Sequence, residues 1–318
     1  MTRKAIIGMI RAAALGAALF LAGGAIPILG GVAMLFAPAP VLIYAVGREH
    51  ANLRSSIAVL LAAVLVSVAA GWFAGASYLA TFGIATLIIS LLLERRYRFE
   101  VIVVAVVAVF LVVATLGALI ATGSPAALVK AMQTELTTGM ARGSQLYKMV
   151  GMPNAVPADT QAEIIDLTIK LSPALVAMLA ALAALMNLRI FWRWVGRQRL
   201  PYTLFGDLLR WSAPERLIWA LIGTGFGIMA PVQALSALAL NGFLCVAAVY
   251  FCQGLAIMAF YFQMLAVPSI VRGVIYFIAL VQPVVAAIVC VAGVFDMWID
   301  FRRLKPPRQE AGNFSDFI

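Results

Sequence analysis

The sequence predicts an all-α fold, a polytopic transmembrane helical bundle of about eight to ten elements with a small extracytoplasmic helical cap. Hydrophobic residues make up 64% of the 318 residues and charged residues only 11%, whereas soluble chains average about half and about a quarter. The apolar residues form uncharged runs of about 20 residues, the length that a helix needs to cross a hydrocarbon core. These runs lack the polar face of a helix on a soluble domain, so the lipid bilayer is the expected solvent.

The first apolar block is too long for one span, and glycine pairs and prolines interrupt it. We therefore expect one helix near 8–28 and a shorter one near 32–47, kinked by Pro38 and Pro40. Glycines or charged turns separate the spans that come next. Three such spans are expected near 55–71, 76–93 and 101–121.

Residues 122–170 carry charges of both signs and interrupt the apolar runs. Ser124–Pro125 has the form of a helix N-cap followed by proline at the first helical position. Thr160 and Glu163 have the spacing of a capping box, which predicts a second helix start. We expect this segment to form the extracytoplasmic cap and its last helix to continue into a sixth span near 171–192.

The last third of the chain holds apolar stretches near 217–234, 241–265 and 271–299. Three crossings would place the basic tail that starts at Arg302 on the opposite side from the other basic loops. We therefore expect that one stretch is re-entrant, or that the last one breaks at Pro283 into two short elements. Broken helices at membrane depth occur where they line a cavity.

The net charge is +10, and the basic residues gather near the ends of the apolar runs. Cytoplasmic loops accumulate Lys and Arg, so we expect a multi-pass protein with a cytoplasmic N-terminus. No basic stripe interleaved with aromatic residues is present, which argues against a nucleic-acid partner. The expected parts are N-terminal transmembrane helices at 1–121, an extracytoplasmic amphipathic cap at 122–170, C-terminal transmembrane helices at 171–301 and a cytoplasmic tail at 302–318.

The chain shows no constellation for catalysis or metal binding. Cys245, Cys252 and Cys290 lie in apolar segments without CxxC spacing, and His50 is the single histidine. No P-loop and no HExxH motif occur. We therefore expect no enzyme activity, no cofactor, no metal and no ATPase activity of the chain itself.

Polar side chains within the spans are the candidates for a ligand site, because they are rare there. Asn187, Asn241, Tyr250 and Gln253 could line a cavity for a polar ligand. The alternative is that they form hydrogen bonds between helices, each worth about 0.6 kcal/mol. The sequence leaves both interpretations open.

Small residues at a spacing of four allow helices to approach closely. Ala14, Ala18 and Ala22 form such a ladder on the first span, and Gly223 and Gly227 form a second pair. The ladder either docks a partner subunit or packs within the protein, and the glycine pair favours helix packing.

Asp296 and Asp300 lie one helical turn apart, close to Arg302 and Arg303. Two carboxylates on one helix face could relay protons or hold a cation. The alternative, which we favour, is that they pair with the neighbouring arginines at the membrane interface.

Several short motifs resemble the YybS-like family of uncharacterised bacterial inner-membrane proteins. They are Asn241–Gly242, Tyr250–Ala256, Asp296, Trp298–Arg302 and the proline-rich Phe36–Pro40, and the resemblance covers roughly 10–303. That family is distantly similar to the substrate-binding S components of energy-coupling-factor transporters, which dock on a membrane coupling protein through small residues of their first helix. The chain departs from a six-helix S component by its additional spans after residue 215.

The resemblance implies a solute-binding or transport-related subunit of the bacterial inner membrane. Its partners would be the lipid bilayer and a membrane coupling protein with separate ATPases, or a second copy of the chain. The alternative is a non-transporting membrane scaffold or assembly factor.

Overall fold

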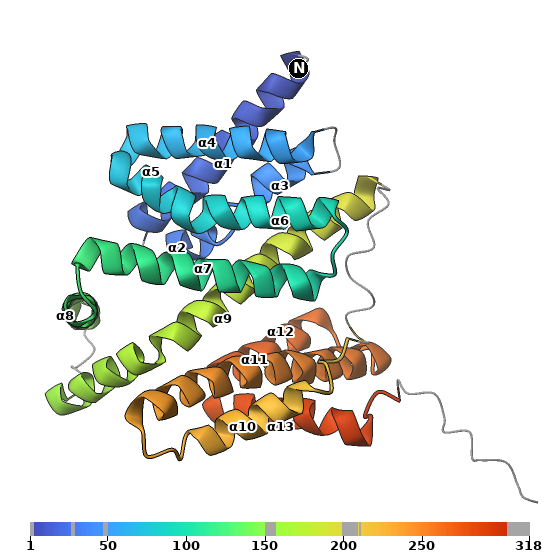
Figure 1. Cartoon of the computed structure of the whole chain (residues 1–318). Coiled ribbons are helices and arrows are strands. Elements are labelled where there is room, and N and C mark those ends of the chain that lie inside the picture. The colour runs from blue at the N-terminus through green and yellow to red at the C-terminus, as the bar shows by residue number, and fades with distance from the viewer. Residues whose placement is uncertain are drawn as a thin grey trace, which may run out of the picture. The chain divides into compact units, whose positions relative to one another are not determined.

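A computed structural model of the chain describes residues 3–26, 29–46, 50–149, 157–198, 209 and 211–303. The chain divides into two compact units, Met1–Phe205 and Gly206–Ile318. All regular structure in the described residues is helical, which confirms the all-α prediction (Figure 1). Of the expected parts, 150–156 of the cap and 304–318 of the tail lie outside the described residues.

The first unit contains every helix up to α9. Its elements are α1 (Arg3–Ala25), α2 (Leu29–Met34), α3 (Ala39–Ala45), α4 (Ala51–Ala70), α5 (Trp72–Tyr78), the π-helix η1 (Leu79–Gly83), α6 (Ile84–Glu94), α7 (Phe99–Thr122), α8 (Pro125–Met149) and α9 (Ala158–Gln198). The second unit consists of α10 (Leu217–Gly227), α11 (Gln233–Met264), α12 (Ser269–Val281) and α13 (Pro283–Ile299).

Six helices in the described ranges are long and apolar enough to cross a membrane, and a bent pair makes a seventh candidate. The count of apolar helices that could span is therefore lower than the expected eight to ten elements. The reason is length: the apolar segments Leu29–Ala45 and Leu217–Gly227 are too short to span, and α12 and α13 meet at a bend of 100°.

The prolines act on the second apolar segment as predicted. The turn at residues 35–38 separates α2 from α3, and α3 begins with proline at its first turn. Proline lacks the N–H group that an uninterrupted helix needs at this position. The sixth span also follows its prediction, because α9 runs without interruption from the expected cap into the apolar segment.

The core of the first unit forms where α1 packs on α4 through alanines. Ala13 and Ala17 of α1 are buried in one cluster with Ala58 and Ala62 of α4 and with Tyr78. Alanine side chains let two helix backbones approach closely, which favours association of helices in lipid.

Candidate functional site

Helices α11 and α13 run parallel in close contact within the second unit. Cys290 Sγ donates to the carbonyl of Ala247 at 3.3 Å, and Gln253 Nε2 donates to Asp296 Oδ2 at 3.1 Å, and each pair is separated by 43 residues. A constant separation of paired residues means that both helices advance in the same direction. The crossing also requires glycine, because a Cβ at Gly254 would collide with the backbone of α13 at Val289.

Helix α10 runs antiparallel to α11. A Cβ added to Gly227 would lie 2.8 Å from Ala239 Cβ, and one added to Gly242 would lie 3.0 Å from Thr224 Cγ2. Thr224 thus lies beside Gly242, and Gly227, further along α10, lies beside Ala239, which comes earlier in α11. The segment that leads into α10 therefore reaches α11 near Gln253, at the same level as Asp296 of α13.

Gln253, Asp296 and Arg302 meet at this level, and we call them the polar cluster. Arg302 Nη2 pairs with Asp296 Oδ2 at 2.6 Å, and these side chains are 0% and 4% exposed. Gln253 is 2% exposed and bridges the two neighbouring elements, since its Oε1 accepts the N–H of Ala213 at 3.0 Å while its Nε2 donates to Asp296. The favoured interpretation that Asp296 pairs with an arginine is confirmed, although the pair is buried.

The polar cluster also supplies hydrogen bonds to the backbone of the segment before α10. Arg302 Nη1 donates to the carbonyls of Leu209 and Trp211 at 2.7 and 2.9 Å. Residues 211–214 have no regular structure. Non-helical backbone is tolerated inside a membrane protein where neighbouring groups satisfy it, and Arg302 and Gln253 supply such bonds here.

Three buried polar atoms at or near this level have no hydrogen-bond partner among the described residues. They are Asp296 Oδ1, Arg302 Nε and Tyr250 Oη. A buried polar atom without a partner costs about 1–3 kcal/mol. The cluster thus keeps one acceptor and one donor for a further group.

Helix α12 begins, and helix α13 ends, near the C-terminal end of α11. Ser269 begins α12 shortly after Met264 ends α11, and the rings of Phe262 and Tyr276 lie 5.4 Å apart. At the end of α13, the carbonyl of Phe301 accepts the hydroxyl of Tyr261 at 2.9 Å. The prediction of a break at Pro283 is confirmed, because α13 starts there.

Asn187 of α9 plays a related role in the first unit. Its Nδ2 donates to the carbonyls of Leu35, in the break between α2 and α3, and of Ala183, each at 2.7 Å. Its Oδ1 is buried and has no partner among the described residues. In both units a polar side chain thus bonds the backbone of a segment between helices.

The four expected ligand-lining residues are divided between the two units. Tyr250 and Gln253 lie one turn apart on α11 and are both buried. Asn241 lies about two and a half turns before Tyr250 on the same helix. It is half-buried, and its Nδ2 lies 2.8 Å from the carbonyl of Ala237. Asn187 belongs to the first unit.

The small-residue motifs are only partly buried. Ala14 and Ala18 are exposed and Ala22 is half-buried, since α1 turns the neighbouring face with Gly16 and Ala17 to its unit. In the second motif, Gly227 packs on Ala239 whereas a Cβ at Gly223 would meet open space.

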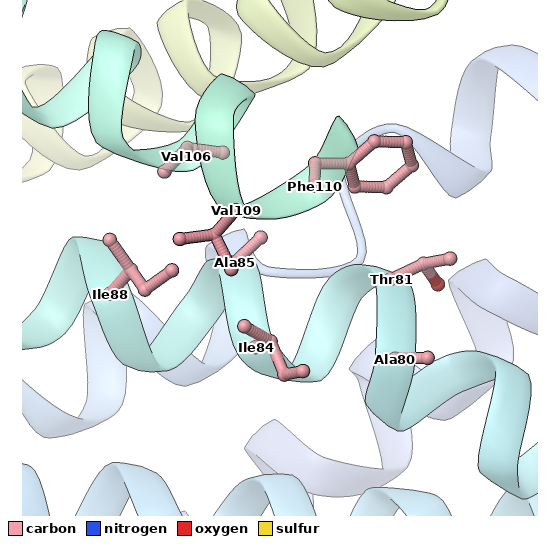
Figure 2. Close-up of a pocket in the computed structure, with 8 residues that line it drawn as sticks. All are labelled: Ala80, Thr81, Ile84, Ala85, Ile88, Val106, Val109 and Phe110. Atoms are coloured by element: carbon pink, nitrogen blue, oxygen red, sulfur yellow. The ribbon is translucent and has the colours of Figure 1, made fainter. Parts of the chain in front are cut away.

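A shallow hollow lies between the α6 region and α7 in the first unit. Figure 2 shows its side chains, which are almost all apolar. Its empty volume is about 150 Å³ including open space at the mouth, and it has no room for a water-sized sphere. It is therefore no site for a polar solute. The lining residues are Ala80, Thr81, Ile84, Ala85, Ile88, Val106, Val109 and Phe110.

The apolar helices and the irregular, hydrogen-bonded segments between them define a polytopic α-helical membrane protein. A family model described as "Predicted membrane protein (DUF2232)" matches residues 14–297. The chain therefore belongs to the DUF2232 family of predicted membrane proteins. No curated protein and no solved structure matches the chain.

Proposed function

We propose that this protein is a solute-binding or transport-related membrane subunit that has no ATPase activity of its own. The observation that carries the proposal is the buried polar cluster beside the bent α12–α13 pair. Broken helices and ionisable side chains at membrane depth mark binding sites and transport pathways in many membrane proteins. The resemblance to S components points to the same class.

The energetics of the polar cluster favour a functional role. Removing two charges from water costs several kcal/mol per ion, and a buried ion pair is often no more stable than apolar residues of the same volume. The Asp296–Arg302 pair is thus not expected to raise the stability of the fold above that of apolar residues of the same volume. The acceptor and the donor that have no partner among the described residues suit a small polar solute that carries both a donor and an acceptor.

The α12–α13 pair acts as a re-entrant hairpin in this proposal. Arg272 lies in the first turn of α12 and Arg303 follows α13, and both of these helix ends lie near the end of α11. Placing this basic end in the cytoplasm satisfies the preference of Lys and Arg for cytoplasmic loops. The hairpin then adds no crossing, and we place Arg303 and the N-terminus together on the cytoplasmic side of the inner membrane.

A coupling protein with its ATPases, or a second copy of the chain, would dock on α1. Ala14 and Ala18 are exposed on the face of α1 that its own unit does not cover. Small residues permit close approach of a partner helix in lipid. The alternative, a membrane scaffold or assembly factor, would use this face without any solute.

The test combines ligand screening with substitutions on one helix. Protein purified in a mild detergent is screened by thermal shift against vitamins, other small polar solutes and metal ions, and co-purifying ATPases are identified. We expect one class of solute to raise Tm, Gln253→Leu to abolish that shift, and Asn241→Leu, the matched control on α11, to retain it. No shift with any solute, together with no co-purifying ATPase, would overturn the transport proposal. Normal cellular function of the Gln253→Leu variant would favour the scaffold.

A further inference from the structure

Helix α8 begins directly after a span ends. Helix α7 is the candidate span with the highest mean hydropathy, and it stops at Thr122. Gly123 follows with φ +77°, a left-handed conformation that ends helices. The hydroxyl of Ser124 then accepts the N–H of Ala127 at 3.2 Å and caps α8, which starts at Pro125. The start of α8 is therefore held at the level where the chain leaves the hydrocarbon core.

The direction of α8 keeps the rest of the helix at that level. Figure 1 shows α8 end-on, while α7 and α9 lie across the view, so α8 runs crosswise to both. A helix that runs crosswise to two spans at their ends lies along the membrane surface. Its 25 residues extend for about 37 Å in an α-helix.

The side chains of α8 are segregated around the helix axis. At 3.6 residues per turn, the large apolar residues from Pro125 to Met140 fall within an arc of about 120°, whereas Met149 at the end of α8 lies outside it. Thr134 lies opposite the middle of this arc, and Lys130 also lies outside it. The apolar residues of the arc are Pro125, Leu128, Val129, Met132, Leu136 and Met140.

The apolar arc has no complete partner among the described residues of the first unit. None of the side chains described for α8 is buried, and Val129 is 42% exposed. Met132 and Leu136 are only half-buried. A long helix with a wide apolar face and low overall hydrophobicity is typical of helices that lie in the membrane interface.

We propose that α8 is an interfacial helix whose apolar arc inserts into the boundary between headgroups and acyl chains. The occupant of this face is the lipid surface, because the end of α7 places α8 there. Lys130 and Arg142 lie outside the arc, where their long side chains can reach lipid phosphates. This inference is independent of the proposed transport function.

The test uses the full-length protein in lipid nanodiscs. Cys245, Cys252 and Cys290 are replaced by alanine, and single cysteines carrying a nitroxide are placed at successive positions of α8. Accessibility to oxygen, which concentrates in lipid, is compared with accessibility to a water-soluble nickel chelate. We expect positions 132 and 136 to favour oxygen and positions 134 and 137 to favour the nickel chelate, with a period of 3.6 residues.

Two results would overturn the proposal. The first is equal exposure of all positions to the nickel chelate, which would place α8 in water. The second is protection of positions 132 and 136 from both reagents, which would mean that protein covers the arc. A matched pair of substitutions gives a second readout: Leu136→Glu should raise nickel accessibility at position 132 several-fold, whereas Thr137→Glu should leave it unchanged. Equal effects of the two substitutions would also contradict the proposal.

Discussion

Substitution of Asp296 by asparagine tests whether the buried ion pair is held as the structure shows. Asparagine keeps the shape of the side chain and an acceptor for Arg302, but it removes the charge. The Arg302 side chain is fully buried, so water cannot replace the lost carboxylate unless the 209–211 backbone moves. Breaking a buried pair by removing one partner costs about 3–5 kcal/mol, and we expect a loss of that size for Asp296→Asn.

A matched control exists on the surface of the first unit. Lys170 and Asp166 form an ion pair of similar length, 2.7 Å, but their side chains are 54% and 63% exposed. Exposed pairs contribute about 0.2–1 kcal/mol, so Asp166→Asn should change the free energy of unfolding little. Reversible unfolding of both variants in mixed micelles, followed by circular dichroism, measures the difference. A loss for Asp296→Asn no larger than for Asp166→Asn would refute the burial argument.

Two other substitutions test the helix contacts. Gly254→Ala should lower the free energy of unfolding by about 1–3 kcal/mol through overpacking, because the added Cβ would collide with Val289 of α13. Gly273→Ala is the control, because a Cβ at Gly273 would meet open space. Equal stability of the two variants would count against the close crossing. Asn187→Leu should cost about 1–3 kcal/mol, because the carbonyl of Leu35 loses its donor, and unfolding in the same micelles would show no loss if that bond were unimportant.

The apolar helices and the break at Pro283 could be predicted because they depend on local chemistry. An apolar run of sufficient length has one favourable solvent, and proline disfavours helical geometry in the residue before it. Gln282 accordingly has φ −92° and ψ 110°, which is extended backbone. The orientation in the membrane and the partners remain predictions.

The pairing of Asp296 with an arginine could be predicted, but the burial of the pair and its contacts with Gln253 and the backbone could not, because they depend on a turn and on distant backbone. Asp300 and Arg303 have φ of 48° and 49°, left-handed values at the end of α13. Arg302 lies between these two residues, and its guanidinium pairs with Asp296 six residues earlier in the chain. No pattern in the sequence reveals either the left-handed residues or the carbonyls of 209 and 211.

The buried face of α1 was ambiguous for a different reason. An alanine-rich helix offers several equivalent stripes of small residues, and the sequence cannot choose among them. The stripe with Ala13 and Ala17 is buried because Tyr78 and α4 pack on it. Ala14 and Ala18 therefore remain exposed, which keeps the docking hypothesis open to test.

In both units, polar side chains form hydrogen bonds with backbone groups of non-helical segments. A backbone that leaves helical geometry inside a membrane protein exposes carbonyl and N–H groups that lipid cannot satisfy. Asn187 serves the α2–α3 break, and Gln253 with Arg302 serves the segment before α10. Apolar side chains and unbroken helices would avoid this cost altogether. The chain nevertheless retains polar side chains and irregular backbone in both units. It also leaves Asp296 Oδ1 without a partner among the described residues. For these physical reasons, we expect its function to depend on these two places.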